Sequence, residues 1–274
     1  MQKSSTFAVL KSKKSVKIKQ VLSALEQFAP LPLQESWDNA GLQIGLTEAE
    51  VSGALLCLDV TEKIIDEAVA KGCNLVVSHH PLLFRGLKQV SDANDVQRTV
   101  RKAIKHDICV ISMHTNMDNA KGGVNFKIAE RLGATPISPN NPIGPTEKIP
   151  MVLAELPKPM EAFAFISLVK ERFGVKCAHC NELLQRPVKT VAICGGAGDF
   201  MLDDAIAQGA DAFITGEMHY HVFFGHEQEI QICVIGHYES EQFTSEIFQE
   251  IIQKECPGVK TFIAETITNA ICYY

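Results

Sequence analysis

The chain has 274 residues, of which 46% are apolar and 21% charged, a composition typical of a folded globular protein. Its length suits one large domain or two small ones. The 26 basic and 32 acidic side chains give a net charge of −6, which argues against a dedicated nucleic-acid-binding protein. No apolar run reaches the roughly 20 residues of a membrane-spanning helix. Composition therefore disfavours disorder, coiled coil, collagen and membrane channel.

Two compositional features bear on the cellular compartment. The first 19 residues contain six lysines and no acidic residue, and they lack the apolar run of a secretory signal and the arginines of a mitochondrial leader. We therefore expect residues 1–17 to form a flexible basic tail. The nine cysteines are odd in number and mostly flank apolar runs, which predicts reduced thiols and a cytoplasmic location. Cys177 and Cys180 form a single CxxC pair, which without a second pair is expected to be structural.

In the first half of the chain, hydrophobic spacing predicts alternating helices and strands. Apolar residues at helical spacing predict a helix from Ile18 to Phe28, which Pro30 and Pro32 end. Residues 35–45, with the only tryptophan, are expected to form a loop. The later elements are expected as a strand over 54–60, a helix over 63–71, a strand over 74–78, a helix over 96–106, a strand over 108–113 and a helix that follows Gly123 and ends at residue 132.

The second half repeats this alternation after a proline-rich connection. Five prolines fall within residues 134–150, a density that excludes helix and central strand. The elements expected beyond it are strands over 151–156, 188–194, 212–215, 232–235 and 260–264, and helices over 162–173, 201–208 and 243–252. We therefore predict an α/β fold with two lobes, residues 18–133 and 151–274, whose sheets are mixed, largely parallel and flanked by helices.

A shift of 137 residues aligns two segments without a gap. Residues 56–78 and 193–215 share a strand, a helix with two acidic residues and an alanine, a glycine turn and a second strand. Such a rhythm is common to βαβ units, so an unrelated pair remains the competing interpretation. If the repeat is real, His79 and His80 correspond to Gly216 and Glu217, and the two lobes face each other across one cleft.

Imidazoles and carboxylates follow three of the predicted strands. Ligands in open α/β sheets bind beyond the carboxyl ends of strands, so one cleft can collect these side chains. Their chemistry suits borderline divalent ions such as Zn, Mn or Fe(II), and the adjacent histidines before Pro81 can serve two ions. The alternative is a set of ordinary core or surface histidines. We predict two divalent ions held by His79, His80, Asp118, His237 and Glu241.

Other polar residues near the same strand ends are candidates for supporting roles. His114 is ambiguous: it can orient a ligand or carry a proton rather than bind metal. Gly195, Gly196 and Gly198 form a turn between a strand and a helix that can bind a substrate anion, or that is simply a tight turn. His219 and His221 are candidates for lining the cleft. The sequence contains no nucleophile elbow and no HExxH motif.

Six segments resemble, in the same order, the motifs of the NIF-three-like family, also called dinuclear metal-centre proteins of the YbgI type or GTP cyclohydrolase I type 2 homologues. They are WDNAGLQIG (37–45), SHHPLLF (78–84), HTNMDNAKGGVN (114–125), CGGAGDF (194–200), TGEMHYH (215–221) and GHYESE (236–241). The resemblance covers about residues 18–270 and is that of the compact form without a central insert domain. It implies two related lobes, a homohexamer built as a trimer of dimers, and a two-metal site on the five ligands named above, with Glu241 as the bridge.

The leading functional hypothesis is a cytoplasmic, metal-dependent hydrolase of the GTP cyclohydrolase type. A metal-held hydroxide would attack a small phosphorylated or heterocyclic substrate. One alternative is a non-catalytic metal-binding or trafficking oligomer. Another is an interaction scaffold whose metal is structural. Neither a membrane nor a nucleic acid is expected as a partner.

Overall fold

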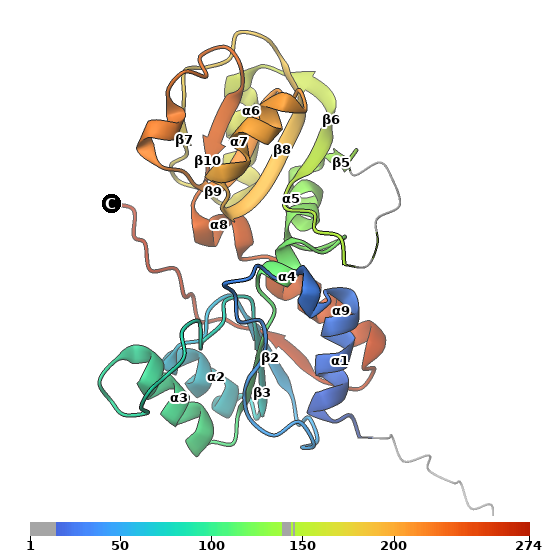
Figure 1. Ribbon diagram of the computed structural model, residues 1–274, viewed down its shortest axis with the longest axis vertical. Helices are drawn as coiled ribbons and strands as arrows, with labels where there is room; N and C mark the ends of the chain where they lie inside the picture. Colours follow the sequence, from blue (N-terminus) through green and yellow to red (C-terminus); the bar gives the residue numbers. More distant parts are fainter. Residues whose placement is uncertain (1–14, 139–143, 145) are drawn as a thin grey trace, which may run out of the picture.

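The computed structural model describes residues 15–138, 144 and 146–274. Two mixed sheets flanked by helices form two lobes, stacked along the long axis of the molecule (Figure 1), which confirms the predicted α/β architecture. The helices are α1 (Ile18–Phe28), α2 (Glu62–Ala70), α3 (Asp95–Lys105), α4 (Thr115–Asp118), α5 (Val124–Leu132), α6 (Ala162–Phe173), α7 (Leu202–Ala207), α8 (His237–Glu241) and α9 (Thr244–Glu255). The single turns η1 (Leu31–Leu33), η2 (Asp199–Met201) and η3 (Tyr220–Phe223) are 3-10 helices.

The first sheet has the strand order β1-β4-β3-β2-β11. Its four neighbouring strands β4, β3, β2 and β11 run parallel, and β1 pairs antiparallel with β4. The strands β2, β3 and β4 are buried along their whole length because helices cover both faces, as parallel sheets require. The bounds of these strands are β1 (Gly41–Ile44), β2 (Ala54–Cys57), β3 (Leu75–Ser78), β4 (Cys109–Ser112) and β11 (Thr261–Ile263).

The second sheet has the order β5-β6-β8-β9-β10-β7. Strands β8, β9 and β10 run parallel, whereas β5, β6 and β7 add antiparallel pairs. The bounds of these strands are β5 (Thr135–Pro136), β6 (Val152–Met160), β7 (His179–Cys180), β8 (Val188–Ala197), β9 (Ala212–Glu217) and β10 (Gln231–Val234).

The internal repeat extends to the pairing of the strands. In the first lobe Ala54 lies opposite Leu75, and in the second Val191 lies opposite Ala212. Each of these residues is related to its counterpart by the same shift of 137 positions, so both βαβ units have the same register. The carboxyl ends of β3 and β9 are therefore equivalent positions in the two sheets.

One hydrophobic core runs through both lobes. It joins alternate residues of the first sheet, such as Leu56 and Val77, to residues of the second, such as Ile193 and Ile214. Helices α1, α5, α6 and α9 contribute to it, while α2 and α3 cover the opposite face of the first sheet and α7 that of the second. Because the two lobes share this core, their relative position is fixed by packing.

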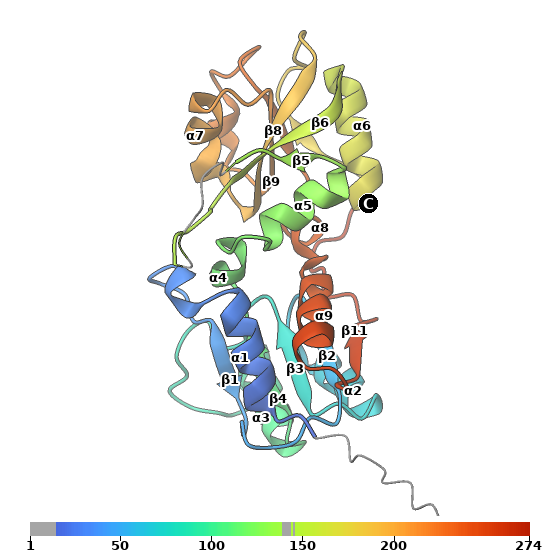
Figure 2. The same cartoon turned by 90° about the vertical axis from the view of Figure 1, so that its right-hand side faces the viewer.

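The structure departs from the predicted boundaries at three places. Residues 41–44, expected within a loop, form the edge strand β1 against β4. The last segment does not stay with residues 151–274 as one lobe: α9 packs on α1, and β11 pairs with β2 (Figure 2). The predicted connection 134–150 contributes β5 to the second sheet.

The remaining sequence predictions concern the basic tail and the membrane. Within the predicted tail, residues 1–14 lie outside the described residues, and Lys17 forms a β-bridge with Glu50. Of the helices in the described ranges, none has both the length and the apolar character needed to cross a bilayer.

Candidate metal centre

The carboxyl ends of β3, β4 and β10 bring the predicted ligands together between the lobes. β3 ends at Ser78, and Pro81 keeps the chain extended through the two histidines that follow. Helix α4 carries Asp118, and helix α8 carries His237 and Glu241 at its two ends. Three sets of ligand atoms converge within 4.8 Å of one another: those of His79, Asp118 and Glu241, those of His80, His237 and Glu241, and those of His79, His80 and His114.

His79 directs a lone pair into the site. Its ring is fully buried, and Nδ1 lies 2.8 Å from the backbone carbonyl oxygen of Met113. A carbonyl only accepts, so Nδ1 carries the proton and Nε2 is an acceptor. Nε2 lies 3.4 Å from Asp118 Oδ1 and 3.7 Å from Glu241 Oε1, and among the described residues it has no hydrogen-bond partner. A buried nitrogen acceptor facing two carboxylates is suited to a cation.

His80 and His237 form a second convergence on Glu241. Their Nε2 atoms lie 3.0 and 3.1 Å from Glu241 Oε2 and 3.3 Å from each other. The Nδ1 atom of His80 lies 2.7 Å from Asp59 Oδ1, and that of His237 lies 3.0 Å from Glu217 Oε1. Carboxylates that hold Nδ1 leave Nε2 to a metal, which is the usual arrangement of a metal-binding histidine.

Burial and charge act on this cluster in opposite directions. Burial favours neutral histidines, but Asp59 and Glu241 outweigh it and raise the pKa of His80 to about 10. Glu241 likewise outweighs burial at His237 and raises its pKa to about 9. Burial raises the pKa of Glu241 itself, and His79, His237 and His80 together hold it well below its usual value. The carboxylates therefore favour positive charge beside the histidine nitrogens, and either protons or metal ions can supply it.

His114 lies beside the ligands but has a different setting. Its ring centroid is 5.3 Å from that of His79 and 5.4 Å from that of His80. Its Nδ1 lies 2.8 Å from Asp38 Oδ1, and Asp38 also accepts hydrogen bonds from the backbone and hydroxyl of Thr115. Burial raises the pKa of Asp38, yet the bonds from His114 and Thr115 bring it down to about 2. Asp38 thus fixes the orientation of His114 at the edge of the site.

The glycine turn has a different role from the predicted anion site. The N–H groups of Gly195, Gly196 and Gly198 donate to side-chain oxygens of Asn125, Ser240 and Thr215. They are therefore not available to an anion in this conformation. Gly196 has a φ of +63°, and a Cβ there would lie 2.3 Å from Glu241 Oε1. This glycine leaves the space that the central carboxylate occupies.

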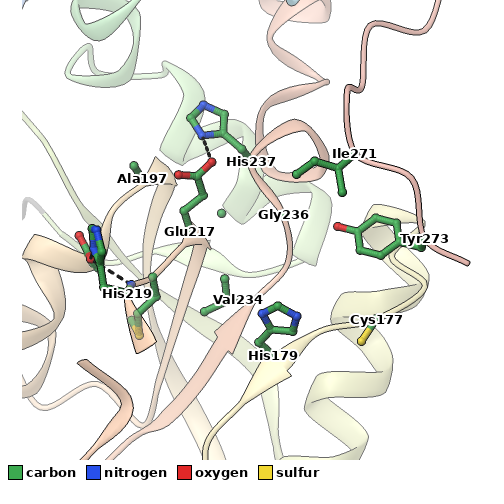
Figure 3. Close-up of a pocket in the computed structure, with 13 residues that line it drawn as sticks. Cys177, His179, Ala197, Glu217, His219, Val234, Gly236, His237, Ile271 and Tyr273 are labelled. Carbon is green, nitrogen blue, oxygen red and sulfur yellow. Dashed lines mark hydrogen bonds and ion pairs between the residues drawn. The ribbon is translucent and has the colours of Figure 1, made fainter. Parts of the chain in front are cut away.

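A cavity of about 410 Å³ adjoins the metal centre on the side of His237 (Figure 3). Glu217 and His237 form one end of it, and Ile271 and Tyr273 from the C-terminal segment lie across from Val234 and His179. Of the two histidines proposed to line the cleft, His219 lines this cavity and pairs with Asp199. His221 lies in η3 and does not line the cavity: its ring lies beside those of Tyr220 and Phe224.

Sequence reasoning missed the three carboxylates that hold the histidines. Asp59 lies two residues after β2 and Glu217 ends β9, so both lie at carboxyl ends of strands, where the ligands themselves were sought. Asp38 belongs to a loop whose position depends on the contact with Thr115, which sequence spacing does not reveal.

Known proteins are similar to this chain over most of its length. A Clostridium perfringens protein named GTP cyclohydrolase 1 type 2 homolog is 37% identical over 229 residues, covering 82% of this chain and 87% of that one. A Campylobacter jejuni protein of the same name is 30% identical over 255 residues, with 93% and 98% covered.

Solved structures share the fold. The Staphylococcus aureus hypothetical protein SA1388 superposes with a TM-score of 0.85 at 26% identity, over 95% of this chain and 100% of that one. A Bacillus cereus protein related to NIF3 has a TM-score of 0.82 at 23% identity, over 95% and 100%. Residues 16–270 match the Duf34/NIF3 (NGG1p interacting factor 3) family along nearly the whole length of the chain. The chain belongs to the Duf34/NIF3 family.

Proposed function

We propose that the protein is a metal-dependent hydrolase with two divalent ions bridged by Glu241. The observation that carries the proposal is that two of the three converging ligand sets, each containing Glu241, share only this residue. In one set, His79 Nε2 lies near both Asp118 Oδ1 and Glu241 Oε1, and in the other His80 and His237 lie near Oε2. Zn, Fe and Mn all suit imidazole and carboxylate ligands, so the donor set leaves the choice among them open.

The residues around the site would divide the work of hydrolysis. Bound divalent ions would supply a Lewis acid and lower the pKa of a bound water. Glu241 would hold the two histidine sets at a fixed separation, because its carboxylate is buried and contacts both. His114, oriented by Asp38 and 15% exposed, is placed to accept or donate a proton at the rim.

The adjoining cavity supports a small, phosphorylated or heterocyclic substrate. Its walls combine the apolar side chains of Val234, Met218 and Ile271 with the polar groups of Tyr273 and His219. A planar ring can pack on the apolar wall while a polar substituent points toward His237 and the metal ligands. GTP is one concrete candidate, which the names of the C. perfringens and C. jejuni relatives suggest.

The test combines metal content with turnover. The purified protein is reconstituted with Zn, Fe or Mn, its metal is counted per chain by mass spectrometry, and GTP and phosphoesters are screened for hydrolysis. We expect two ions per chain and turnover that His79→Ala and Glu241→Ala abolish, whereas the exposed His106→Ala retains both. Turnover that survives both ligand substitutions would refute the proposal. Full metal occupancy without any turnover would favour a metal-binding or trafficking protein.

We also propose a cytoplasmic homohexamer, a trimer of dimers. All nine cysteines are free thiols and six of them are buried, which supports a reducing compartment. Large apolar side chains that a monomer leaves exposed, such as Leu46, Phe163 and Ile267, support self-association. Light scattering tests the assembly: a mass of one chain, 30.1 kDa, at micromolar concentration would contradict it.

A further inference from the structure

Two cysteines from distant parts of the chain face each other at the edge of the second sheet. Strand β7 pairs antiparallel with β10, and Cys180 lies directly opposite Cys233 in that pairing. Directly opposed residues of a strand pair point their side chains to the same face of the sheet, so the two thiols lie beside each other. Directly opposed residues of an antiparallel pair have Cα atoms about 4.5–5.5 Å apart, which lies within the range that a disulfide spans.

The surroundings give the two sulfurs different exposure. Cys180 is half-buried on the short edge strand, and Cys233 is fully buried on β10. The hydrogen bond to Cys233 lowers the pKa of the Cys180 thiol against the effect of burial, and the Lys170 ammonium acts in the same direction. A reagent from solvent therefore meets Cys180 first, and Cys233 is held immediately behind it.

We propose that Cys180 and Cys233 form a reversible cross-strand disulfide by exchange with a small disulfide such as oxidised glutathione. The partner of Cys180 is thus Cys233, rather than Cys177 of the CxxC sequence. Cys177 lies before the strand, is exposed and lines the cavity beside the metal centre.

The exchange balances in two steps. The Cys180 thiolate attacks one sulfur of oxidised glutathione, forms a mixed disulfide and releases one glutathione thiolate. The Cys233 thiolate then attacks the Cys180 sulfur and releases the second. The two protein thiols give up two protons and two electrons, and one small disulfide becomes two small thiols. An excess of small thiol reverses both steps.

The bond would join the wall of the cavity to the strand that precedes a candidate metal ligand. His179 and Val234, the neighbouring pair of the same ladder, both line the cavity. His237 follows β10 after only two intervening residues. The disulfide would close a loop over residues 181–232, which contains β8, α7 and β9, so the oxidised protein should resist unfolding better than the reduced one.

Peptide mapping under non-reducing conditions tests the proposal on the full chain. The reduced protein is treated with oxidised glutathione, blocked with N-ethylmaleimide and cleaved after glutamate. This cleavage places Cys177 and Cys180 in residues 172–182, Cys194 in 183–217 and Cys233 in 230–239. We expect residues 172–182 to be linked to residues 230–239, and a thermal midpoint that rises by at least about 5 °C on oxidation.

Single substitutions identify whether Cys177 or Cys180 forms the link to residues 230–239. Cys177→Ser should keep the link, which then leaves Cys180 as the only cysteine in its peptide, and Cys180→Ser should lose it. The Cys177→Ser result alone is decisive, so the test does not depend on Cys180→Ser folding. Glutathione found on Cys177 and Cys272, with Cys180 and Cys233 both unmodified, would overturn the proposal. So would a link that Cys177→Ser abolishes.

Discussion

At the residue scale, the position of the Glu241 carboxylate depends on the histidines beside it and on the space that Gly196 leaves. Its carboxylate is 4% exposed and receives histidine nitrogens on both oxygens, so it cannot move without losing one set of contacts. Gly196 lies directly beneath Oε1 on a bulged part of β8. The absence of a side chain at this glycine is thus part of the metal site.

We expect Gly196→Ala to abolish metal binding while the fold persists. The new Cβ would displace a carboxylate that His80 and His237 hold, and the metal content by mass spectrometry should fall well below that of the wild type. Gly209→Ala is the matched control, since Gly209 also has a positive φ, +75°, but has open space at its Cβ. Both variants should lose about 1–2 kcal/mol of stability from backbone strain. Wild-type metal content in Gly196→Ala would contradict this view of Glu241.

The carboxylates behind the histidines should matter almost as much as the ligands. Asp59 holds His80 through Oδ1 and is itself fixed by the hydroxyl of Thr268, which donates to Oδ2. Asp59→Asn should weaken metal binding about 10–100-fold, because the ring loses its orientation and basicity. Metal titration by calorimetry measures the change, with the exposed Asp66→Asn as the control. Equal metal affinity in Asp59→Asn and Asp66→Asn would show that metal binding by His80 does not depend on Asp59.

At the element scale, one carboxylate ties the beginnings of two parallel strands together. Asp211 precedes β9, accepts hydrogen bonds of 2.9 Å from the backbone N–H groups of Lys189 and Thr190 in β8, and pairs with Arg186. Burial raises the pKa of Asp211, but these bonds prevail and hold it below its usual value. The ionised form is therefore the one that the folded state prefers.

Asp211→Asn should cost about 1–3 kcal/mol of unfolding free energy near neutral pH. The contribution of the carboxylate is complete above the unfolded-state pKa of about 4 and is lost as the pH falls through the lower folded-state value. Urea denaturation at a series of pH values should therefore show a constant gap between wild type and variant above about pH 5, and a narrowing gap below about pH 4. A difference in unfolding free energy that widens as the pH falls would show that the ionised Asp211 carboxylate does not stabilise the folded state.

The elements predicted from the sequence are those with long hydrophobic patterns. Helix α6 begins and ends where it was predicted, and β2, β3 and β4 lie within their predicted ranges because buried parallel strands read as continuous apolar runs. Strand β1 was missed because Gly41 and Gln43 interrupt its apolar residues, so it has no continuous apolar run. The return of β11 to the first sheet depends on packing against β2, which local sequence does not encode.

The five candidate ligands were predictable because one rule, that ligands lie beyond the carboxyl ends of strands, applies to all of them. Strand ends gave the histidine pair, His237 and the two ligand carboxylates, and the structure brings these five together. The hydrogen bonds that saturate the glycine turn were not predictable, because Asn125 and Ser240 come from other elements. Which histidines are held by carboxylates likewise could not be predicted, because Asp59, Asp38 and Glu217 lie 20 or more residues along the chain from their partners.

At the scale of the whole molecule, the metal centre lies where the lobes meet. Asp118 comes from helix α4 after the first sheet, while His237 and Glu241 come from helix α8 after the second. The chain then returns through α9 and β11 to the first lobe, and a single hydrophobic core continues through both. Metal binding at this centre would therefore stabilise the arrangement of the two lobes rather than a single loop.

Metal should accordingly stabilise both lobes together. At a free concentration 100 times the dissociation constant, a bound ion adds about 2.7 kcal/mol, which for a chain of this size is a rise of roughly 5–10 °C in the thermal midpoint. Trp37, the only tryptophan, lies beside His114 and reports on the first lobe by fluorescence, whereas circular dichroism reports on all helices and strands. Both probes should shift by the same amount on metal addition and return on chelation, and neither should shift in Glu241→Ala. A shift confined to fluorescence would mean that the ions bind the first lobe alone, and unfolding on chelation at 25 °C would mean that the metal is a structural requirement of the fold.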